Sequence, residues 1–238
     1  MKLTYLLINF FTIIVPFIFS FHPKLKFNKY FKPFALANVL IALVFIGWDV
    51  FFTNLGVWGF NPKYVTGFYF INLPIEEILF FICIPFACVF TYHCLTLFFK
   101  LRWKKKFEDL LIILISVSLL IIGIVFFEKK YTAFTFISFS VSLLIGYYFI
   151  NKDAVIKLLS IYPFLLIPFF IVNGILTGTG LEEPVVWYNN AENLGIRLLT
   201  IPVEDIFYGL ELILLNVILY EYFKKKFTQR NFLHDGAE

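Results

Sequence analysis

The chain has 238 residues, of which 61% are hydrophobic, and a net charge of +4; its mean hydropathy is +0.86. A soluble domain is only about half apolar, whereas several stretches here run for about 20 residues without a charge, the length that crosses a bilayer as a helix. The composition therefore excludes a soluble globular fold and predicts an all-α integral membrane protein.

Seven apolar stretches predict transmembrane helices, at residues 3–21, 34–53, 74–99, 109–127, 131–150, 158–177 and 200–223. The first is not expected to be a cleaved signal peptide, because it lacks a small-residue cleavage site and a basic loop follows it. Cys83, Cys88 and Cys94 lie in one of these apolar stretches at a spacing that fits no metal site, so we expect no disulfide and no metal ion.

Basic residues are unevenly divided between the two sides of these seven spans. One side holds five: Lys2, Lys63, Lys129, Lys130 and Arg197. The other side holds fifteen: Lys24, Lys26, Lys29, Lys32, Lys100, Arg102, Lys104, Lys105, Lys106, Lys152, Lys157, Lys224, Lys225, Lys226 and Arg230. The positive-inside rule predicts a multi-pass cell-membrane protein with its N-terminus outside and its C-terminus in the cytoplasm. The net charge follows from this topology, and no nucleic-acid partner is expected.

The chain also matches itself after a gap-free shift of 128 residues, which aligns residues 61–80 with residues 189–208. The matched pairs are Lys24 with Lys152, Asn61 with Asn189, Gly67 with Gly195, Pro74 with Pro202, Glu76 with Glu204, Glu77 with Asp205, and Tyr92 with Tyr220. We interpret residues 1–106 and 131–238 as two three-span repeats and residues 107–130 as a linker span.

The linker span gives the two repeats the same orientation, with a pseudo-two-fold axis along the membrane normal. Both P-x-E-[ED] segments then lie at one depth, at the outer ends of the third and seventh spans. If the repeats pack face to face, their four acids are expected to converge across the axis.

One acid in each segment has an ordinary structural explanation. Proline is favoured at the first position of a helix, and Glu76 would then face the positive end of the helix dipole from the third position. Leu73 and Ile201 precede the two prolines, so neither segment can complete a capping box. The second acid in each segment remains unexplained, which favours a functional site.

Other polar residues within the spans are candidates for supporting that site. Asp49 is the most costly to place in a membrane, which favours a functional role, whereas amides in spans often bridge helices. Glu221 lies near the basic inner interface, where a solvated position is expected. The supporting candidates are Trp48, Asp49, Asn173, Asn216 and Glu221.

Paired acids in a dry, aromatic environment suit acid–base chemistry on an apolar substrate. A buried carboxyl beside another acid can retain a proton near neutral pH and protonate an alkene, while a second carboxylate takes a proton back. The 34 Phe and 13 Tyr fit either a lipid-facing surface or an aromatic cavity that stabilises a carbocation. No nucleotide-binding motif is present, and no cofactor is expected.

The segments "LPIEEILFFICIPFACVFTY" and "IPVEDIFYGLELILLNVILYEYF" resemble the paired signatures of the membrane-integral lycopene cyclases of bacteria, archaea and fungi, in their fused form. The resemblance covers nearly the whole chain. It departs at His93, since family members often carry a glutamate there, as Glu221 does after Tyr220.

This resemblance implies an isomerase, an intramolecular lyase, that closes the ψ-ends of lycopene into β-rings and gives β-carotene through a monocyclic intermediate. It implies a carotenoid substrate in the bilayer and other carotenoid-pathway enzymes as partners. It makes Glu76, Glu77, Glu204 and Asp205 the acid and base groups, and we expect Glu76 and Glu204 to matter most because they hold the P-x-E position.

Two alternatives remain open from the sequence. The cation could be captured by water, as in a carotenoid hydratase, or the substrate could be a longer carotenoid. Intramembrane acids and parallel repeats also occur in proton-coupled transporters.

Overall fold

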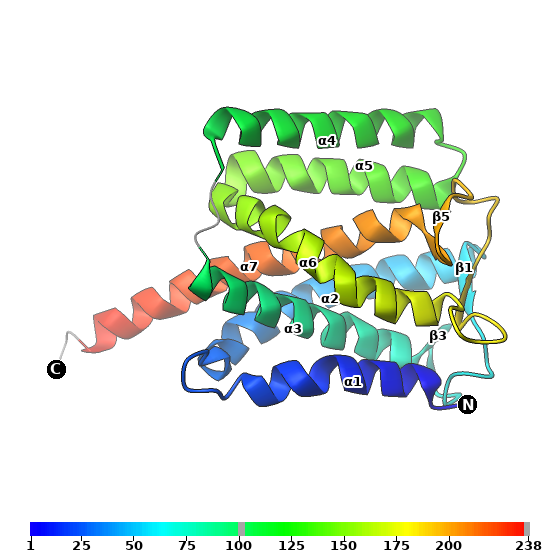
Figure 1. Ribbon diagram of the computed structural model, residues 1–238, viewed down its shortest axis with the longest axis horizontal. Coiled ribbons are helices and arrows are strands. Elements are labelled where there is room, and N and C mark those ends of the chain that lie inside the picture. Colours follow the sequence, from blue (N-terminus) through cyan, green and yellow to red (C-terminus); the bar gives the residue numbers. More distant parts are fainter. Residues whose placement is uncertain (100–102, 236–238) are drawn as a thin grey trace.

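The computed structural model describes residues 1–99 and 103–235, so Lys100 and Arg102 of the charge count lie outside the described residues. It is a helical bundle with short strands gathered at one end, which also holds the N-terminus (Figure 1). The helices are α1 (Thr4–Phe19), α2 (Phe31–Asn54), α3 (Ile75–Phe98), α4 (Lys105–Val125), α5 (Lys130–Ile145), α6 (Lys152–Leu176) and α7 (Val203–Asp235). A 3-10 turn, η1 (Phe27–Tyr30), precedes α2, and a π-helical turn, η2 (Gly146–Ile150), follows α5.

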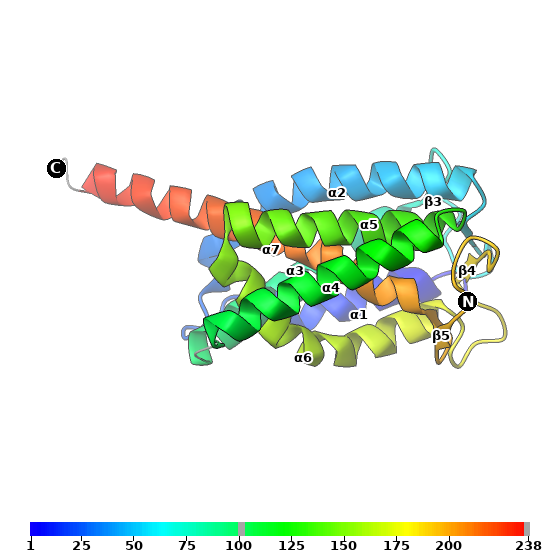
Figure 2. The same cartoon turned by 90° about the horizontal axis from the view of Figure 1, so that it is seen from above.

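Six helical segments within the described residues are long and apolar enough to cross a membrane, and α1 is a shorter apolar helix of 16 residues. The chain is therefore built as an all-α membrane protein. α4 lies beside α5 at one edge of the bundle and α1 lies at the opposite edge (Figure 1). α7 runs through the middle and continues beyond the bundle (Figure 2).

Two helices differ most from their predicted boundaries. α6 begins six residues earlier than the predicted 158–177, because the side chain of Asn151 caps it by accepting from the backbone N–H of Ala154 at 3.1 Å. α7 extends to Asp235 instead of ending at residue 223, since its polar continuation contains neither glycine nor proline before Gly236.

The sequence did not predict strands, and the structure has short pairs at the N-terminal end of the bundle. Two are hairpins that lead directly into helices. One joins β2 (Tyr69–Phe70) to β3 (Leu73–Pro74) ahead of α3, and the other joins β5 (Arg197–Leu198) to β6 (Ile201–Pro202) ahead of α7.

Both hairpins turn through a non-glycine residue in the left-handed backbone region. Ile71 and Leu199 each have a φ of 59°, a conformation that bulky residues rarely adopt and that costs about 1–3 kcal/mol. The two residues are 128 positions apart, so the same strained turn occurs in both repeats.

Pro74 and Pro202 do not occupy the first helical position that the sequence predicted. Pro74 is extended, with φ −64° and ψ 148°, and it ends β3, so that α3 begins at Ile75. The N–H of Ile75 donates to the carbonyl of Phe68 at 2.9 Å and closes the hairpin. Glu76 is therefore the second residue of its helix rather than the third, and the same holds for Glu204 after Val203.

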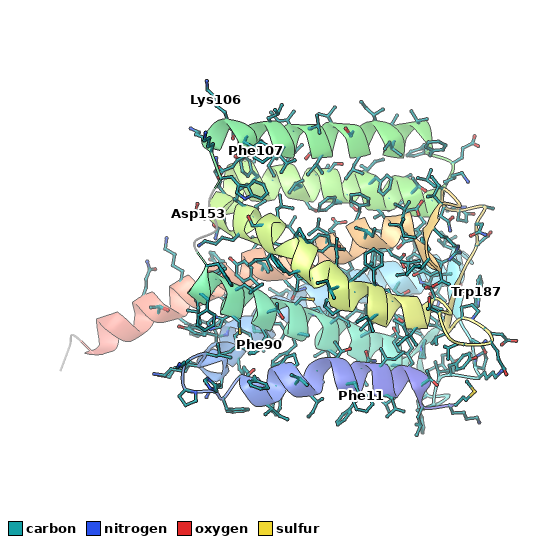
Figure 3. The ribbon with its side chains drawn as sticks, in the orientation of Figure 1. Phe11, Phe90, Lys106, Phe107, Asp153 and Trp187 are labelled. Atoms are coloured by element: carbon teal, nitrogen blue, oxygen red, sulfur yellow. The ribbon has the colours of Figure 1, made fainter. Side chains whose placement is uncertain are left out.

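The third strand pair joins the two repeats. β1 (Trp58–Phe60) pairs antiparallel with β4 (Val186–Tyr188), with Gly59 opposite Trp187. These strands are equivalent under the shift of 128, so the pairing is self-complementary, like an interface on a two-fold axis. Figure 3 shows Trp187 at this end, which we call the strand-bearing end, and Lys106 and Asp153 at the opposite end.

The gap-free shift of 128 is wrong for the first two helices of each repeat. The N–H of Tyr5 donates to the carbonyl of Tyr64, and the N–H of Tyr131 donates to the carbonyl of Glu192. These two carbonyls are 128 residues apart, but the two tyrosines are 126 apart (131 − 5), which places α5 at a shift of 126. Val57 and Val185 are 128 residues apart, and their N–H groups donate to the carbonyls of Phe52 and Leu176, which places α6 at a shift of 124 (176 − 52). Loops of different length absorb the differences.

We predict that Gly59→Ala destabilises the protein. An added Cβ would overlap the indole ring of Trp187, and overpacking of this kind costs about 1–3 kcal/mol. Thermal unfolding in detergent micelles measures the effect, and Trp187→Ala in the same chain should remove most of it.

Gly47→Ala is the matched control, because a Cβ at Gly47 in α2 meets nothing within 4 Å. It should leave stability unchanged or raise it by about 0.5–1 kcal/mol. An equal loss of stability in both variants would contradict the close packing inferred at Gly59.

Candidate active site

A cavity of about 680 Å³ lies among α1, α3, α6 and α7 and is bounded by β1 and β4 at the strand-bearing end. Most of its wall is apolar or aromatic, with contributions from Trp58, Phe80, Phe169 and Tyr208. Its acidic and amide residues are Asp49, Glu77, Asn173 and Asp205. Both repeats therefore contribute carboxyl groups to one apolar space.

Glu77 and Asp49 form the acidic cluster of the first repeat. The Tyr5 hydroxyl donates to Glu77 Oε2 at 2.5 Å, and Asp49 lines the same cavity as Glu77. Asp49 Oδ1 accepts from the indole N–H of Trp58 and from the Thr53 hydroxyl. Two buried carboxyl groups on one apolar cavity favour a state in which one of them keeps a proton.

Asp205 is the carboxyl group of the second repeat. Its Oδ1 accepts from the Tyr131 hydroxyl, and its Oδ2 accepts from the Tyr188 hydroxyl at 3.0 Å. Burial, together with the nearby Asp205, raises the pKa of Tyr188 well above its ordinary value, so Tyr188 remains a donor. Two fixed donors hold the Asp205 carboxylate in one orientation.

The two halves of the site are related but unequal. Tyr5 and Tyr131 are equivalent, and each serves the second acid of its own repeat. Asp49, however, has Asn173 as its counterpart, so the first repeat brings two carboxyls to the cavity and the second brings one. An acid pair on one side and a single carboxylate on the other suit separate proton-donating and proton-accepting roles.

Glu76 and Glu204 are fully buried but do not line the cavity. Glu76 Oε1 accepts from the N–H of Thr66 at 2.7 Å, and Glu204 Oε1 accepts from the N–H of Leu194 at 2.8 Å. Both carboxyls thereby fix the loop that leads into their hairpin. Of the four predicted acids, the structure brings Glu77 and Asp205 into the cavity and places Glu76 and Glu204 behind its wall.

The remaining supporting candidates are spread over the bundle. Trp48 packs against Tyr208 with ring centroids 5.2 Å apart, just outside the cavity wall. Asn216 accepts from the side chain of Asn38 at 3.2 Å and bridges α2 and α7. Glu221 pairs with Lys224 at 3.4 Å, toward the end of the bundle away from the strands. Only Asp49 and Asn173 of the five line the cavity.

Sequence reasoning missed the tyrosines that hold the acids. Tyr5 and Tyr131 stand near the starts of the first and fifth spans, so equivalent positions were the available signal. Tyr188 lies in a loop strand and gave no such signal. Tyr208 follows Asp205 by three residues on α7, one helical turn along the same face, and lines the cavity.

Glu211 is another buried acid, and it lies away from the cavity. Its two oxygens each accept from a serine hydroxyl of α5, Ser138 and Ser142, both at 2.7 Å. Its contacts fix α7 against α5. Among the side chains that the structure describes, in residues 1–99 and 103–229, no three His, Cys, Asp or Glu residues are close enough together to hold a metal ion.

We predict that Glu204→Ala destabilises the protein far more than Glu204→Gln does. Alanine leaves the N–H of Leu194 and the hydroxyl of Thr132 without their acceptor, at a cost of about 1–3 kcal/mol for each buried group. Glutamine keeps an acceptor oxygen. Thermal unfolding in detergent micelles compares the two variants.

Glu182→Ala serves as the control, because Glu182 is exposed and pairs with Lys63 at the surface, where an ion pair contributes about 0–1 kcal/mol. Equal melting temperatures for Glu204→Ala and the unaltered protein would contradict the inference that Glu204 fixes the loop before its hairpin.

Comparison with protein families adds an independent finding. The family model described as lycopene cyclase matches residues 2–95 and 128–223, so it matches both halves and omits the whole of α4. Searches of curated proteins and of solved structures gave no match.

Proposed function

The chain belongs to the lycopene cyclase family, and on this premise we propose that it is a lycopene β-cyclase that closes the ψ-ends of lycopene into β-rings. The observation that carries the proposal is the convergence of Asp49, Glu77 and Asp205 on one apolar cavity. Such a cavity accepts a hydrocarbon end group and presents it with carboxyl groups as the acid and the base.

The proposed reaction begins at the Asp49–Glu77 pair, which gives its proton to the terminal double bond. The next double bond attacks the resulting tertiary cation and forms the ring. Asp205, held by Tyr131 and Tyr188, takes a proton from the ring. One proton enters the substrate and one leaves it, so the reaction is an isomerisation.

The aromatic wall supports the intermediate. Trp58 and Tyr208 both line the cavity, with ring centroids 6.2 Å apart. Their faces are suited to stabilising a carbocation, and the apolar lining limits the water that would convert the cation to an alcohol.

Glu76 and Glu204 enter this proposal as positioning residues. Adjacent residues on a helix point about 100° apart, so each fixes a loop while its neighbour faces the cavity. The preference for Glu76 and Glu204 as acid and base, drawn from the sequence, stays a prediction that variants can test against this geometry.

We place the protein in the cell membrane with seven spans, the N-terminus outside and the C-terminus cytoplasmic. The α1 helix of 16 residues rises about 24 Å, close to the roughly 30 Å of a hydrocarbon core. The repeats are residues 1–106 and 131–238, with residues 107–130 as the linker span. Lycopene enters from the bilayer, where other carotenoid-pathway enzymes are the expected partners.

Expression in a lycopene-producing bacterium tests the activity. We expect lycopene to be converted to β-ring products of unchanged mass, resolved by chromatography and mass spectrometry. Unchanged lycopene beside well-expressed protein would refute the cyclase. A product heavier by one water would indicate a hydratase, and proton flux into carotenoid-free liposomes would indicate a transporter.

The same pigment assay tests the assignment of the acids. Glu77→Gln and Asp205→Asn should each lower the ring yield by at least about 100-fold, the usual contribution of a general acid or base. Asp49→Asn should also be strongly impaired, because it breaks the acid pair.

Glu211→Gln is the matched control, since Glu211 is a buried acid outside the cavity, and it should retain most of the activity at equal protein level. Full activity in Glu77→Gln and Asp205→Asn would refute the assignment. Glu76→Gln should keep substantially more activity than Glu77→Gln.

A further inference from the structure

A second, shallower pocket of about 320 Å³ lies at the strand-bearing end, directly behind the cavity wall. Thr177, Val186 and Tyr188 line both spaces. The partition between the cavity and this pocket is therefore one residue thick at these positions, and two of the three residues carry hydroxyl groups.

A chain of three threonine hydroxyls runs from the surface to the partition, where Thr177 and Thr200 share the second pocket with Tyr188. The Oγ1 atoms of Thr179 and Thr200 lie 2.7 Å apart, and those of Thr200 and Thr177 also lie 2.7 Å apart. Thr179 is exposed, whereas Thr177 is buried and faces the cavity. Each hydroxyl can donate and accept, which is what proton transfer along a chain requires.

Tyr188 stands beside this chain and contacts the reacting group. Its hydroxyl donates to Asp205 Oδ2 at 3.0 Å, and the guanidinium of Arg197 lies over its ring, 5.8 Å from the centroid. Arg197 is itself fixed by the carbonyl of Thr200 at 2.6 Å. The hydroxyl chain and the Asp205 hydrogen bond thus belong to one braced wall.

The first repeat has no such wall. The shift of 128 places Phe60 opposite Tyr188 in the alignment, Tyr69 opposite Arg197 and Asn72 opposite Thr200. The Asn72 amide donates to the carbonyl of Val50 at 2.9 Å and ties the hairpin to α2. The polar route is therefore a property of the Asp205 side alone.

We propose that the wall formed by Thr177, Tyr188 and Thr200 is a proton-exchange route between Asp205 and the solvent at the strand-bearing end. The proposal rests on the proposed acid–base function. After each ring closure Asp205 holds the proton taken from the substrate, and the Asp49–Glu77 pair lacks one. The proton returns from Asp205 to the pair before the next turnover, and the wall exchanges it with solvent in that interval.

Isotope incorporation tests this route. Membranes containing the protein convert lycopene in D₂O, and mass spectrometry measures deuterium in each ring formed. The unaltered protein should place one deuterium per ring over many turnovers. Thr200→Val should place less, because the substrate's own proton is returned to the next substrate, and Thr200→Ser should restore the incorporation.

Thr228→Val is the matched control, since Thr228 lies on the exposed far part of α7 and bonds only locally to the carbonyl of Lys224. It should incorporate deuterium like the unaltered protein. Rings without deuterium from the unaltered protein, or equal incorporation in Thr200→Val, would overturn the route while leaving the cyclase intact.

A measurement without substrate separates this proposal from the activity. Infrared spectroscopy follows the shift of the phenol C–O band of Tyr188 after transfer to D₂O, with Tyr188→Phe identifying the band. Exchange at Tyr188 should be slower in Thr200→Val than in Thr228→Val. Equal exchange rates would overturn the route even if no ring product were ever formed.

Discussion

A carboxyl group buried in an apolar bundle needs either hydrogen-bond donors or a proton, and this constraint governs the molecule. Five acids of the strand-bearing half are buried: Asp49, Glu76, Glu77, Glu204 and Asp205. The loops that lead into the strand hairpins bring backbone N–H groups to Glu76 and Glu204, and helices α1 and α5 bring tyrosine hydroxyls to Glu77 and Asp205. The loops and the first helix of each repeat thus supply the hydrogen-bond donors that the buried acids need.

Helix geometry explains why two adjacent acids stand at the start of α3 and of α7. Two neighbours on a helix point in directions about 100° apart, so one can hold a loop while the other faces a cavity. Glu76 and Glu77 divide these tasks, and Glu204 and Asp205 repeat the division. A single acid at each helix start would leave either the loop or the cavity without its carboxyl. In each doublet, therefore, one acid holds a loop and the other faces the cavity.

The sequence predicted the apolar helices and the position of the doublets, because hydropathy and the proline–acid pattern are local signals. It could not predict the hairpins, because their turns place Ile71 and Leu199 in the left-handed backbone region. A glycine at these positions would have indicated a turn, whereas isoleucine and leucine do not. It also could not bring Asp49 to Glu77, because that approach depends on how α2 packs on α3. Loops of unequal length change the shift for the first two helices of each repeat, and a gap-free comparison cannot detect that change. For the same reason the sequence did not show that Tyr5 and Tyr131 are equivalent.

The pairing of β1 with β4 carries a consequence for how such a chain arose. In a dimer of identical three-helix units, the residue on the two-fold axis would face its own copy. Two tryptophans there could not both lie over the opposite residue, and two glycines would supply no ring, whereas here the ring of Trp187 lies against Gly59. This fit exists only because the two copies differ. The strand pair that joins the halves therefore fits the duplication indicated by the sequence, and it uses a residue pair that two identical halves could not supply.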